Sequence, residues 1–357
     1  MKAVIMSAKY APGHFSHMLA YSSLFESIGY ESVMLIDEGY KTFKKEYGNC
    51  KYETFDNFHS ITADVLLIYN MSIHDSKYIS ILKKNNSKLK VLFVYHEPWF
   101  GYKKWFEDFI SRKESLIDSV KTLGRFFFVK SILKKSDMVL LPSNKAVNYY
   151  EKICVKYNKH YYLFPLVFTD ESNNKSNLKE KKYFSFVSTV QNSKNFTMFL
   201  DYIKFKAKIA PDSMFQIATR SDVTEHVDAE LKALIKQKRL IINHAHSLSN
   251  AEINQAYARS NCIWMLYNRS TQSGVLCKSF MFGTPVIASN IGSFSEVVNS
   301  DNGIILSENY TLDDIDRAYE KIKADFEHFG NGARQTFISN FYFESQIDLF
   351  KKIVMEK

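Results

Sequence analysis

The sequence predicts an α/β protein with two domains, each built around a parallel sheet that helices cover on both faces. Short apolar segments alternate with helical segments from the first residue onward, which is the pattern of βαβ units. Many of these segments are apolar at every position, as expected for strands that are buried on both faces. With 357 residues, of which 46% are hydrophobic, the chain is long enough for two domains with a core each.

The first domain is predicted to span residues 1–170. Its strands are expected at 3–7, 32–36, 63–69, 89–95 and 138–141. A loop that contains Pro12 and Gly13 follows the first strand, and the helix after this loop is expected to end at Gly29. Ser143 is suited to cap the helix that follows the fifth strand.

The polar residues 171–182 are predicted to form a linker, and residues 183–340 a second domain. The strands of this domain are expected at about 183–189, 215–218, 240–243, 262–266 and 286–288. Ser249 and Glu252 form a capping-box pattern at the start of one of its helices. Residues 341–357 are predicted to form a last, amphipathic helix.

The segment 273–289 contains a candidate anion site. A loop with Ser273 and Gly274 leads into a short helix, and Gly283 suits the left-handed position that ends this helix. Unpaired N–H groups and the positive end of the helix dipole favour phosphate at such an N-terminus. We therefore expect the backbone around Ser273, Gly274 and Val275 to bind a phosphate group.

The segment 264–298 resembles the donor-binding segment of family 4 glycosyltransferases, which are retaining enzymes of the GT-B fold. The resemblance includes Gly-x-Pro-Val-Ile-Ala-Ser at 283–289 and Gly…Glu-Val-Val at 292–298. It implies two Rossmann-like domains that face a cleft, with the last helix crossing back to the first domain. The family usually has two Glu residues where this chain has Ser270 and Lys278, and the second Glu holds the donor ribose. The resemblance therefore places Lys278 at the donor.

The segment 187–195 resembles the Gly-Arg-x4-Lys-Asn motif of the same family, whose Arg and Lys neutralise the donor diphosphate. Lys194 matches the Lys, and the resemblance assigns it to donor binding and catalysis, because a cation at this place stabilises the leaving group. Thr189 stands at the donor site where the family has Arg. Arg220 follows a predicted strand and either supplies the missing cation or pairs with Asp222.

Two further candidate site residues lie in the first domain. His96 follows the strand at 89–95, at the carboxyl end where ligand crevices of α/β proteins form. The run His96-Glu97-Pro98 is similar to members of the family whose His lies against the donor sugar, which implies a catalytic role for His96. The alternative is a polar residue that caps a turn. Gly13 matches part of the family's Pro-Pro-x-x-Gly-Gly loop, which implies a donor contact there.

The resemblance implies a retaining hexosyltransferase that uses a nucleotide-sugar donor, a UDP- or GDP-sugar. Its acceptor would be a glycan or an undecaprenyl-linked saccharide in capsule, O-antigen or exopolysaccharide assembly. This scheme needs no protein-bound metal or other cofactor. Because Thr189, Ser270 and Lys278 depart from the family pattern, one alternative stays open: a GT-B protein without transfer activity that acts as a partner subunit or a glycan-binding module.

The net charge of +9 is concentrated in the first domain, since residues 1–170 hold 24 Lys and Arg against 17 Asp and Glu. Such a surplus attracts nucleic acid, an anionic membrane or acidic substrates, and no recognised motif supports nucleic acid. Aromatic and basic residues interleave at 99–135, as in helices at membrane interfaces or in core-facing helices with solvated charges. Scattered cysteines and the lack of a signal peptide or bilayer-spanning segment predict a cytoplasmic protein. Peripheral contact with the inner face of the cell membrane remains open.

Overall fold

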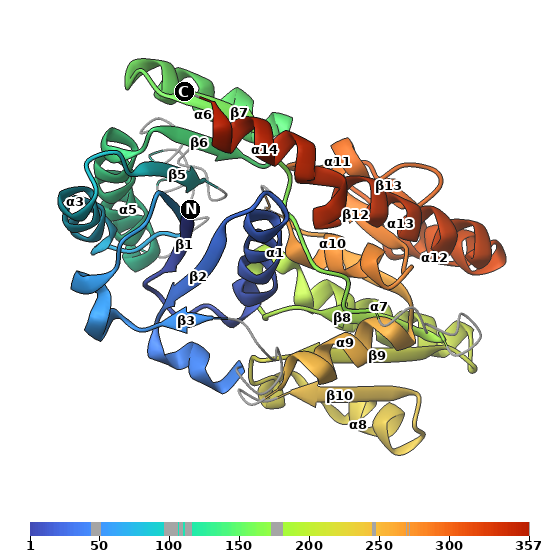
Figure 1. Cartoon of the computed structure of the whole chain (residues 1–357). Coiled ribbons are helices and arrows are strands. Elements are labelled where there is room, and N and C mark those ends of the chain that lie inside the picture. The colour runs from blue at the N-terminus through green and yellow to red at the C-terminus, as the bar shows by residue number, and fades with distance from the viewer. Residues whose placement is uncertain are drawn as a thin grey trace. The chain divides into compact units, whose positions relative to one another are not determined.

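The computed structural model describes residues 1–43, 51–95, 106, 110, 116–172, 181–244, 248–268, 270 and 272–356. The chain forms two compact units: unit 1 consists of Met1–Thr169 with Tyr342–Lys357, and unit 2 consists of Asp170–Phe341 (Figure 1). Each unit contains one sheet whose paired strands are all parallel. The predicted fold class, two doubly wound parallel α/β domains, is confirmed.

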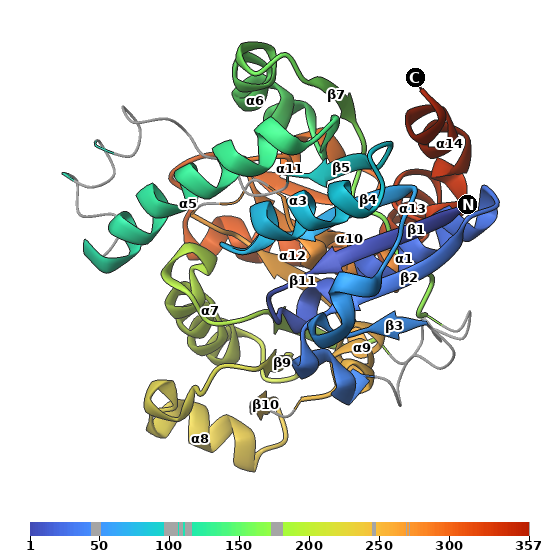
Figure 2. The same ribbon diagram turned by 60° about the vertical axis from the view of Figure 1, so that its left-hand side comes forward.

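Unit 1 is built on a seven-stranded sheet with the order β3-β2-β1-β4-β5-β6-β7. Its strands are β1 (Lys2–Ser7), β2 (Glu31–Ile36), β3 (Tyr52–Glu53), β4 (Val65–Asn70), β5 (Lys90–Val94), β6 (Met138–Leu141) and β7 (His160–Leu163). One face is covered by α1 (Phe15–Ser27) and α14 (Ile347–Met355). The other face is covered by α3 (Asp75–Asn85), α5 (Leu116–Lys135) and α6 (Asn144–Lys156), and Figure 2 shows α3 beside α5.

Strand β1 shows why the strands of this sheet read as continuous apolar runs. Successive side chains of a strand point to opposite faces of the sheet. Ile5 belongs to the core under α1 and α14, in which the rings of Phe25 and Phe350 pack edge to face with centroids 4.9 Å apart. Val4 belongs to the core under α3, α5 and α6. Both faces are therefore buried, and no position of the strand favours a polar residue.

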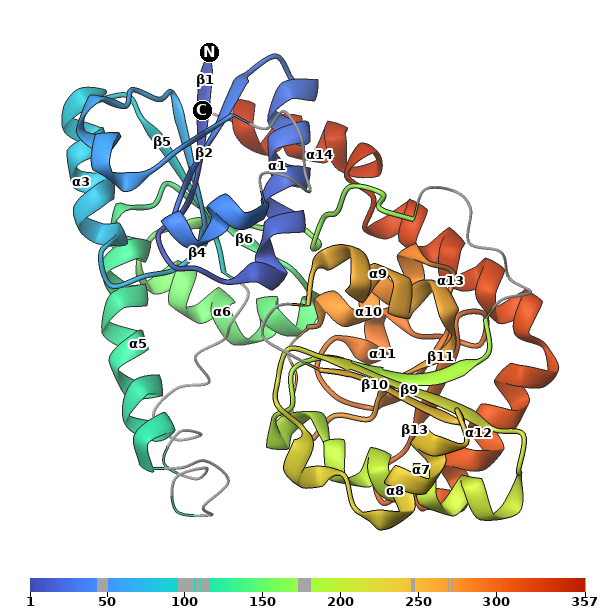
Figure 3. The ribbon, with the colours of Figure 1, turned by 90° about the horizontal axis from the view of Figure 1, so that it is seen from below.

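Unit 2 is built on a six-stranded sheet with the order β10-β9-β8-β11-β12-β13. Its strands are β8 (Tyr183–Val187), β9 (Met214–Thr219), β10 (Leu240–His244), β11 (Ser260–Met265), β12 (Val286–Ser289) and β13 (Gly303–Leu306). The helices of this unit are α7 (Phe196–Ile209), α8 (Ala229–Lys236), α9 (Asn250–Arg259), α10 (Gly274–Met281), α11 (Phe294–Val297), α12 (Leu312–Ala324) and α13 (Phe326–Asn340). Figure 3 shows α9 and α10 on one face of the sheet and α7, α8 and α12 on the other.

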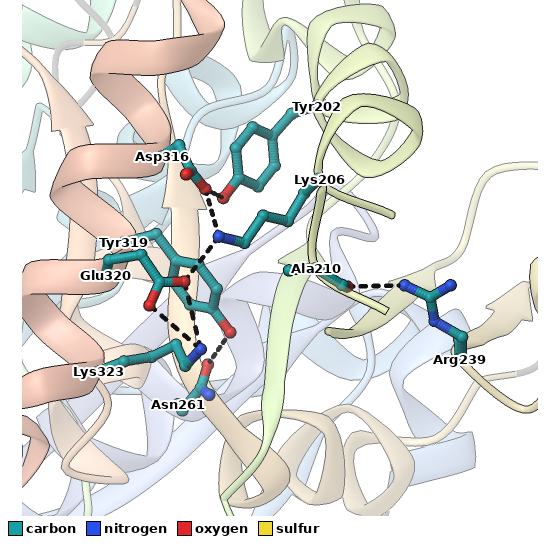
Figure 4. Close-up of polar contacts among 9 residues, drawn as sticks. All are labelled: Tyr202, Lys206, Ala210, Arg239, Asn261, Asp316, Tyr319, Glu320 and Lys323. Carbon is teal, nitrogen blue, oxygen red and sulfur yellow. Dashed lines mark hydrogen bonds and ion pairs between the residues drawn. The ribbon is translucent and has the colours of Figure 1, made fainter. Parts of the chain in front are cut away.

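Helices α7 and α12 are joined by a polar network (Figure 4). Lys206 of α7 is buried, and its Nζ lies 2.7 Å from Asp316 Oδ1 and 2.7 Å from Glu320 Oε1. Tyr202 Oη donates to Asp316 Oδ1 at 3.0 Å. A buried ammonium is costly unless it is paired, and these two carboxylates of α12 balance its charge.

Two local predictions can be compared with the structure directly. Gly283 has a φ of +60° and ends α10, as the sequence predicts for a residue in the left-handed region. The last helix begins later than predicted, at Ile347, after a 3₁₀ turn at Phe343–Gln346. Tyr342 forms a parallel bridge with Phe168, which keeps the residues before the turn extended. Within the described residues, no helix combines the length and the apolar character needed to cross a membrane.

Candidate active site

The strand order of unit 2 reverses between β8 and β11. From β8 the chain moves outward to β9 and β10, and it then returns to β11 and continues on the other side to β12 and β13. Ligands of open α/β sheets bind at such a reversal, beyond the carboxyl ends of the strands. Lys194 lies in the segment that follows β8, and Tyr267 follows β11. The two segments meet at the place where the fold predicts a ligand.

A short 3₁₀ turn, Asn192–Lys194, holds Lys194 against the end of β11. Trp264 Nε1 donates to Lys194 O at 3.3 Å, and Asn268 N donates to Ser193 O at 2.9 Å. The Lys194 ammonium lies over the ring of Tyr267, with Nζ 4.3 Å from the ring centroid. The two hydrogen bonds fix the backbone of Ser193 and Lys194 against the end of β11, and the ring of Tyr267 supports the ammonium.

The electrostatic environment of Lys194 favours an anionic ligand. Burial lowers the pKa of its ammonium to about 8. Among the residues that the structure describes, no carboxylate forms an ion pair with Lys194. The ring of Tyr267 attracts the cation only weakly compared with a counterion. A poorly hydrated ammonium without a carboxylate partner binds an added anion readily, because little water has to be displaced.

Tyr267 connects Lys194 with the start of α10. Burial raises the pKa of the Tyr267 hydroxyl, and the nearby hydroxyls of Ser188 and Ser273 lower it by smaller amounts. Neither Tyr267 Oη nor Ser273 Oγ forms a hydrogen bond of ordinary geometry within the described part of the chain. Buried hydroxyls without such bonds are uncommon, and here the hydroxyls of Tyr267, Ser188 and Ser273 lie close to one another.

The start of α10 supplies backbone donors beside these hydroxyls. Ser273 is the N-cap residue, and its side chain does not cap the helix. The first backbone bond within this turn runs from Leu276 N to Ser273 O at 3.1 Å. Helix geometry therefore leaves the N–H groups of Gly274 and Val275 without an intrahelical acceptor. Lys194, Tyr267 and the amide end of α10 together form the candidate anion site.

Lys278 lies on α10 but is engaged with other residues of unit 2. Its side chain is buried, and its Nζ lies 3.0 Å from Glu171 Oε2 and 3.1 Å from Asn254 Oδ1. The sequence does not reveal that Glu171 balances its charge. A direct contact of Lys278 with the donor stays a prediction.

The remaining predicted site residues are distributed over both units. Arg220 donates Nε to Leu248 O and Nη2 to Asn250 Oδ1, both at 3.0 Å, and so holds the start of α9. Thr189 is exposed just after β8. Gly13 is exposed in unit 1, and a Cβ added there would meet no atom within 4 Å. His96 lies outside the described residues. The roles of these four residues stay predictions.

A comparison with protein families identifies the domain that contains this site. Residues 168–336 match the family described as glycosyl transferases group 1. The match covers most of unit 2. The matched segment includes Lys194, Tyr267 and all of α10. No curated protein matches the sequence.

Solved structures extend the similarity to the whole chain. HepE from Anabaena, in complex with UDP and glucose, is 11% identical, with a TM-score of 0.70 and 100% of each chain covered. A glycosyltransferase from Rickettsia africae is 13% identical, with a TM-score of 0.65 and coverage of 100% of this chain and 99% of that chain. Sucrose-phosphate synthase from Thermosynechococcus elongatus is 12% identical, with a TM-score of 0.63 and coverage of 99% and 98%. At these identities the similarity establishes the fold, which is GT-B, as the resemblance implies.

Two residues of unit 2 that bear on the candidate anion site were not predicted from the sequence. Tyr267 lies two residues after the end of β11, next to the apolar Leu266, so its sequence context favours a core residue. Its place at the carboxyl end of a strand beside the reversal is the signal that could have identified it. Glu171 lies 107 residues before its partner Lys278, in a segment whose composition indicates a linker. No local pattern predicts a pair of that separation.

Proposed function

We propose that this protein transfers a sugar from a nucleotide-sugar donor to a saccharide acceptor. The observation that carries the proposal is the half-buried Lys194 ammonium, which has no ion pair in the described chain and lies over the ring of Tyr267, whose hydroxyl is close to that of Ser273, the N-cap of α10. A nucleoside diphosphate has the charge and the oxygen acceptors that such a site lacks. The structural relative HepE is known in complexes with UDP and with UDP-glucose, which supports a UDP-sugar as donor. A GDP-sugar is the other candidate.

In this proposal the site acts on the leaving group. Negative charge grows on the diphosphate as the bond between the sugar and the phosphate oxygen breaks, and donors that are already in place lower the barrier. Lys194 supplies a point charge, and the N–H groups of Gly274 and Val275 supply directed hydrogen bonds. His96 is proposed to act at the sugar, as the sequence predicts. Retention of the anomeric configuration is part of the proposal and rests on the family resemblance.

The proposed acceptor is a glycan or an undecaprenyl-linked saccharide, as in the assembly of bacterial surface polysaccharides. A lipid-linked acceptor would bring the protein to the cytoplasmic face of an anionic membrane. Helix α5 offers support: its inner side chains Val129 and Leu133 are buried, whereas Val120, Phe127 and Phe128 are exposed at 61%, 58% and 39%. Together with the basic surplus of residues 1–170, this surface suits anionic lipid. Binding to anionic but not to neutral vesicles, weakened by Phe128→Ser, is the expected result of a sedimentation assay.

The test of the proposed activity is calorimetric binding and donor hydrolysis with a panel of UDP-, GDP-, CMP- and dTDP-sugars. Lys194→Ala should weaken binding of the preferred donor by about 10- to 100-fold, the loss expected for a hydrogen bond between charged groups. Lys232→Ala is the matched control, because Lys232 is an exposed lysine of the same unit. Folded protein that binds no member of the panel would favour the alternative, a GT-B protein without transfer activity. The departures at Thr189, Ser270 and Lys278 are the features that favour that alternative.

A further inference from the structure

A closed triangle of polar side chains joins the first residues of unit 2 to α9 and α10. Lys278 Nζ lies 3.0 Å from Glu171 Oε2 and donates to Asn254 Oδ1 at 3.1 Å. Asn254 Nδ2 donates to the same Glu171 Oε2 at 2.7 Å. The side chains of Lys278 and Glu171 are only 11% and 10% exposed. The three groups thus bond to one another, through Oε2 of Glu171, where little water reaches them.

A second ion pair fastens the neighbouring residue to the same helix. Arg334 of α13 forms an ion pair with Asp170, and its Nη1 also donates to Met281 O at 2.6 Å. Met281 is the last residue of α10. Asp170 and Glu171 are the first two residues of unit 2, directly after Thr169, the end of the first segment of unit 1. The junction is therefore fixed to α10 at the middle and at the carboxyl end of the helix.

A buried ion pair of this kind is better suited to fixing geometry than to adding stability. Removing two charges from water carries a large desolvation penalty, and apolar residues of similar volume often stabilise a protein equally well. What the pair does provide is one defined position for each partner. An α10 of eight residues is about 12 Å long, so a tilt at Lys278 also moves its first amides, which lie about one turn away.

We infer that Glu171 is a positioning residue for the donor site, acting through Lys278. The pair holds α10 so that the N–H groups of Gly274 and Val275 stay aligned with the Lys194 ammonium across Tyr267. This inference rests on the proposed function, since it gives the amide end of α10 the role of binding the diphosphate. According to this inference, Lys278 orients α10 and does not bind the donor itself, because Glu171 of the same unit balances its charge.

The pairing with Glu171 changes the expected effect of a substitution at position 278. The family pattern has Glu there, so Lys278→Glu restores the family residue. In this chain, however, the new carboxylate would face Glu171, and two buried carboxylates repel each other. Glu171→Lys combined with Lys278→Glu reverses the pair instead. Asn254 can serve the reversed pair after rotation of its amide, because that amide both donates and accepts.

The experiment compares UDP binding by calorimetry in Glu171→Gln, Lys278→Glu and the reversed double variant. Circular dichroism and thermal unfolding report whether each variant is folded. We expect Glu171→Gln and Lys278→Glu to weaken UDP binding by about tenfold or more, and the reversed variant to bind within about threefold of wild type. If a single variant does not fold, the reversed variant still tests the inference, since only a pairing role predicts that reversing both charges restores UDP binding. Glu230→Gln, which removes one partner of the exposed Glu230–Lys208 pair, is the control without effect.

Other outcomes would overturn the inference. Folded Glu171→Gln that binds UDP more tightly than wild type, with a steeper salt dependence, would mean that Lys278 contacts the donor directly. A folded reversed variant that fails to bind UDP would exclude a role for the pairing itself. Wild-type protein that binds neither UDP nor GDP would overturn the proposed function, and this inference with it. Wild-type binding together with unchanged binding in Glu171→Gln would overturn the inference alone.

Discussion

Binding of UDP should be accompanied by proton uptake at Lys194. Burial lowers the pKa of this ammonium to about 8, so about half of the side chains are uncharged at pH 8 in the absence of ligand. A diphosphate beside the amine favours the charged form and raises its pKa. We therefore expect UDP binding to take up about 0.1 proton at pH 7, about 0.5 at pH 8 and about 0.9 at pH 9. The affinity should fall about tenfold between pH 7 and pH 9, because only the charged amine binds strongly.

Calorimetry in buffers of different ionisation enthalpy measures this uptake directly. The observed binding enthalpy changes linearly with the buffer enthalpy, and the slope is the number of protons exchanged. At pH 8 and pH 9 the phosphates of UDP contribute almost nothing, since their last pKa lies near 6, so these two pH values carry the test. Lys194→Arg is the matched variant, because a guanidinium stays charged at every pH used. It should still bind UDP, with an uptake close to zero, whereas Lys232→Ala should keep the wild-type value.

Two results would refute the reasoning. Wild-type protein that binds UDP without measurable uptake at pH 8 and pH 9 would show that the ligand does not recharge a buried amine. Equal uptake in wild type and in Lys194→Arg would place the titrating group elsewhere. Either result would remove Lys194 from the diphosphate site, even if the protein proved to be an active glycosyltransferase.

Three further predictions concern other groups. Lys181 is buried and donates to Thr284 Oγ1 at 2.7 Å, and burial lowers its pKa to about 7. Between pH 7 and about pH 10 the unfolded chain therefore binds one proton more than the folded chain at this residue. The free energy of unfolding should rise by about 1 kcal/mol per pH unit over this range. Urea unfolding at several pH values should show this slope in wild type but not in Lys181→Met. Burial raises the pKa of Asp75 to about 7, so the folded state holds its proton between about pH 4 and pH 7 and stability from this group falls as pH rises. The stability of Asp75→Asn relative to wild type should accordingly be greater at pH 8 than at pH 5. An equal difference in urea midpoint between variant and wild type at the two pH values would contradict this. His96→Ala should lower turnover more than donor affinity, and steady-state kinetics with unchanged kcat would exclude the predicted role.

The fold was predictable because local signals agree with the tertiary structure along most of the chain. Strands such as β1 and β4 are buried on both faces, so they read as apolar runs that differ clearly from the helices between them. The helix starts were also predictable from local residues. Ser143 caps α6 by accepting from Ala146 N at 3.1 Å, and Ser249 with Glu252 forms a capping box. The start of the last helix was not predictable, because Tyr342 is kept extended by Phe168, a residue far away in the sequence.

The candidate site was predictable only in part. The loop at Ser273 and Gly274 can be predicted from the sequence, because a helix that starts after a strand leaves unpaired amides wherever it occurs. The partners that determine what each charge does are distant in the sequence. The charge of Lys278 is balanced by a carboxylate 107 residues away, and the Lys194 ammonium lies against the ring of Tyr267. Composition and spacing give the type of each residue, whereas the role of a buried charge depends on what the fold places beside it.

Unit 1 is assembled from two separate pieces of the chain, and this has a consequence for how the protein can be made and dissected. Phe350 and Ile353 of α14 belong to the same core as Phe25 of α1, although more than 300 residues lie between them. During synthesis the first 169 residues leave the ribosome without the helix that completes one of their two cores, while unit 2 emerges uninterrupted. An expression plan for the isolated first unit would need Thr169 joined to Tyr342 by a short connector, and the bridge between Phe168 and Tyr342 shows that these two ends already lie side by side.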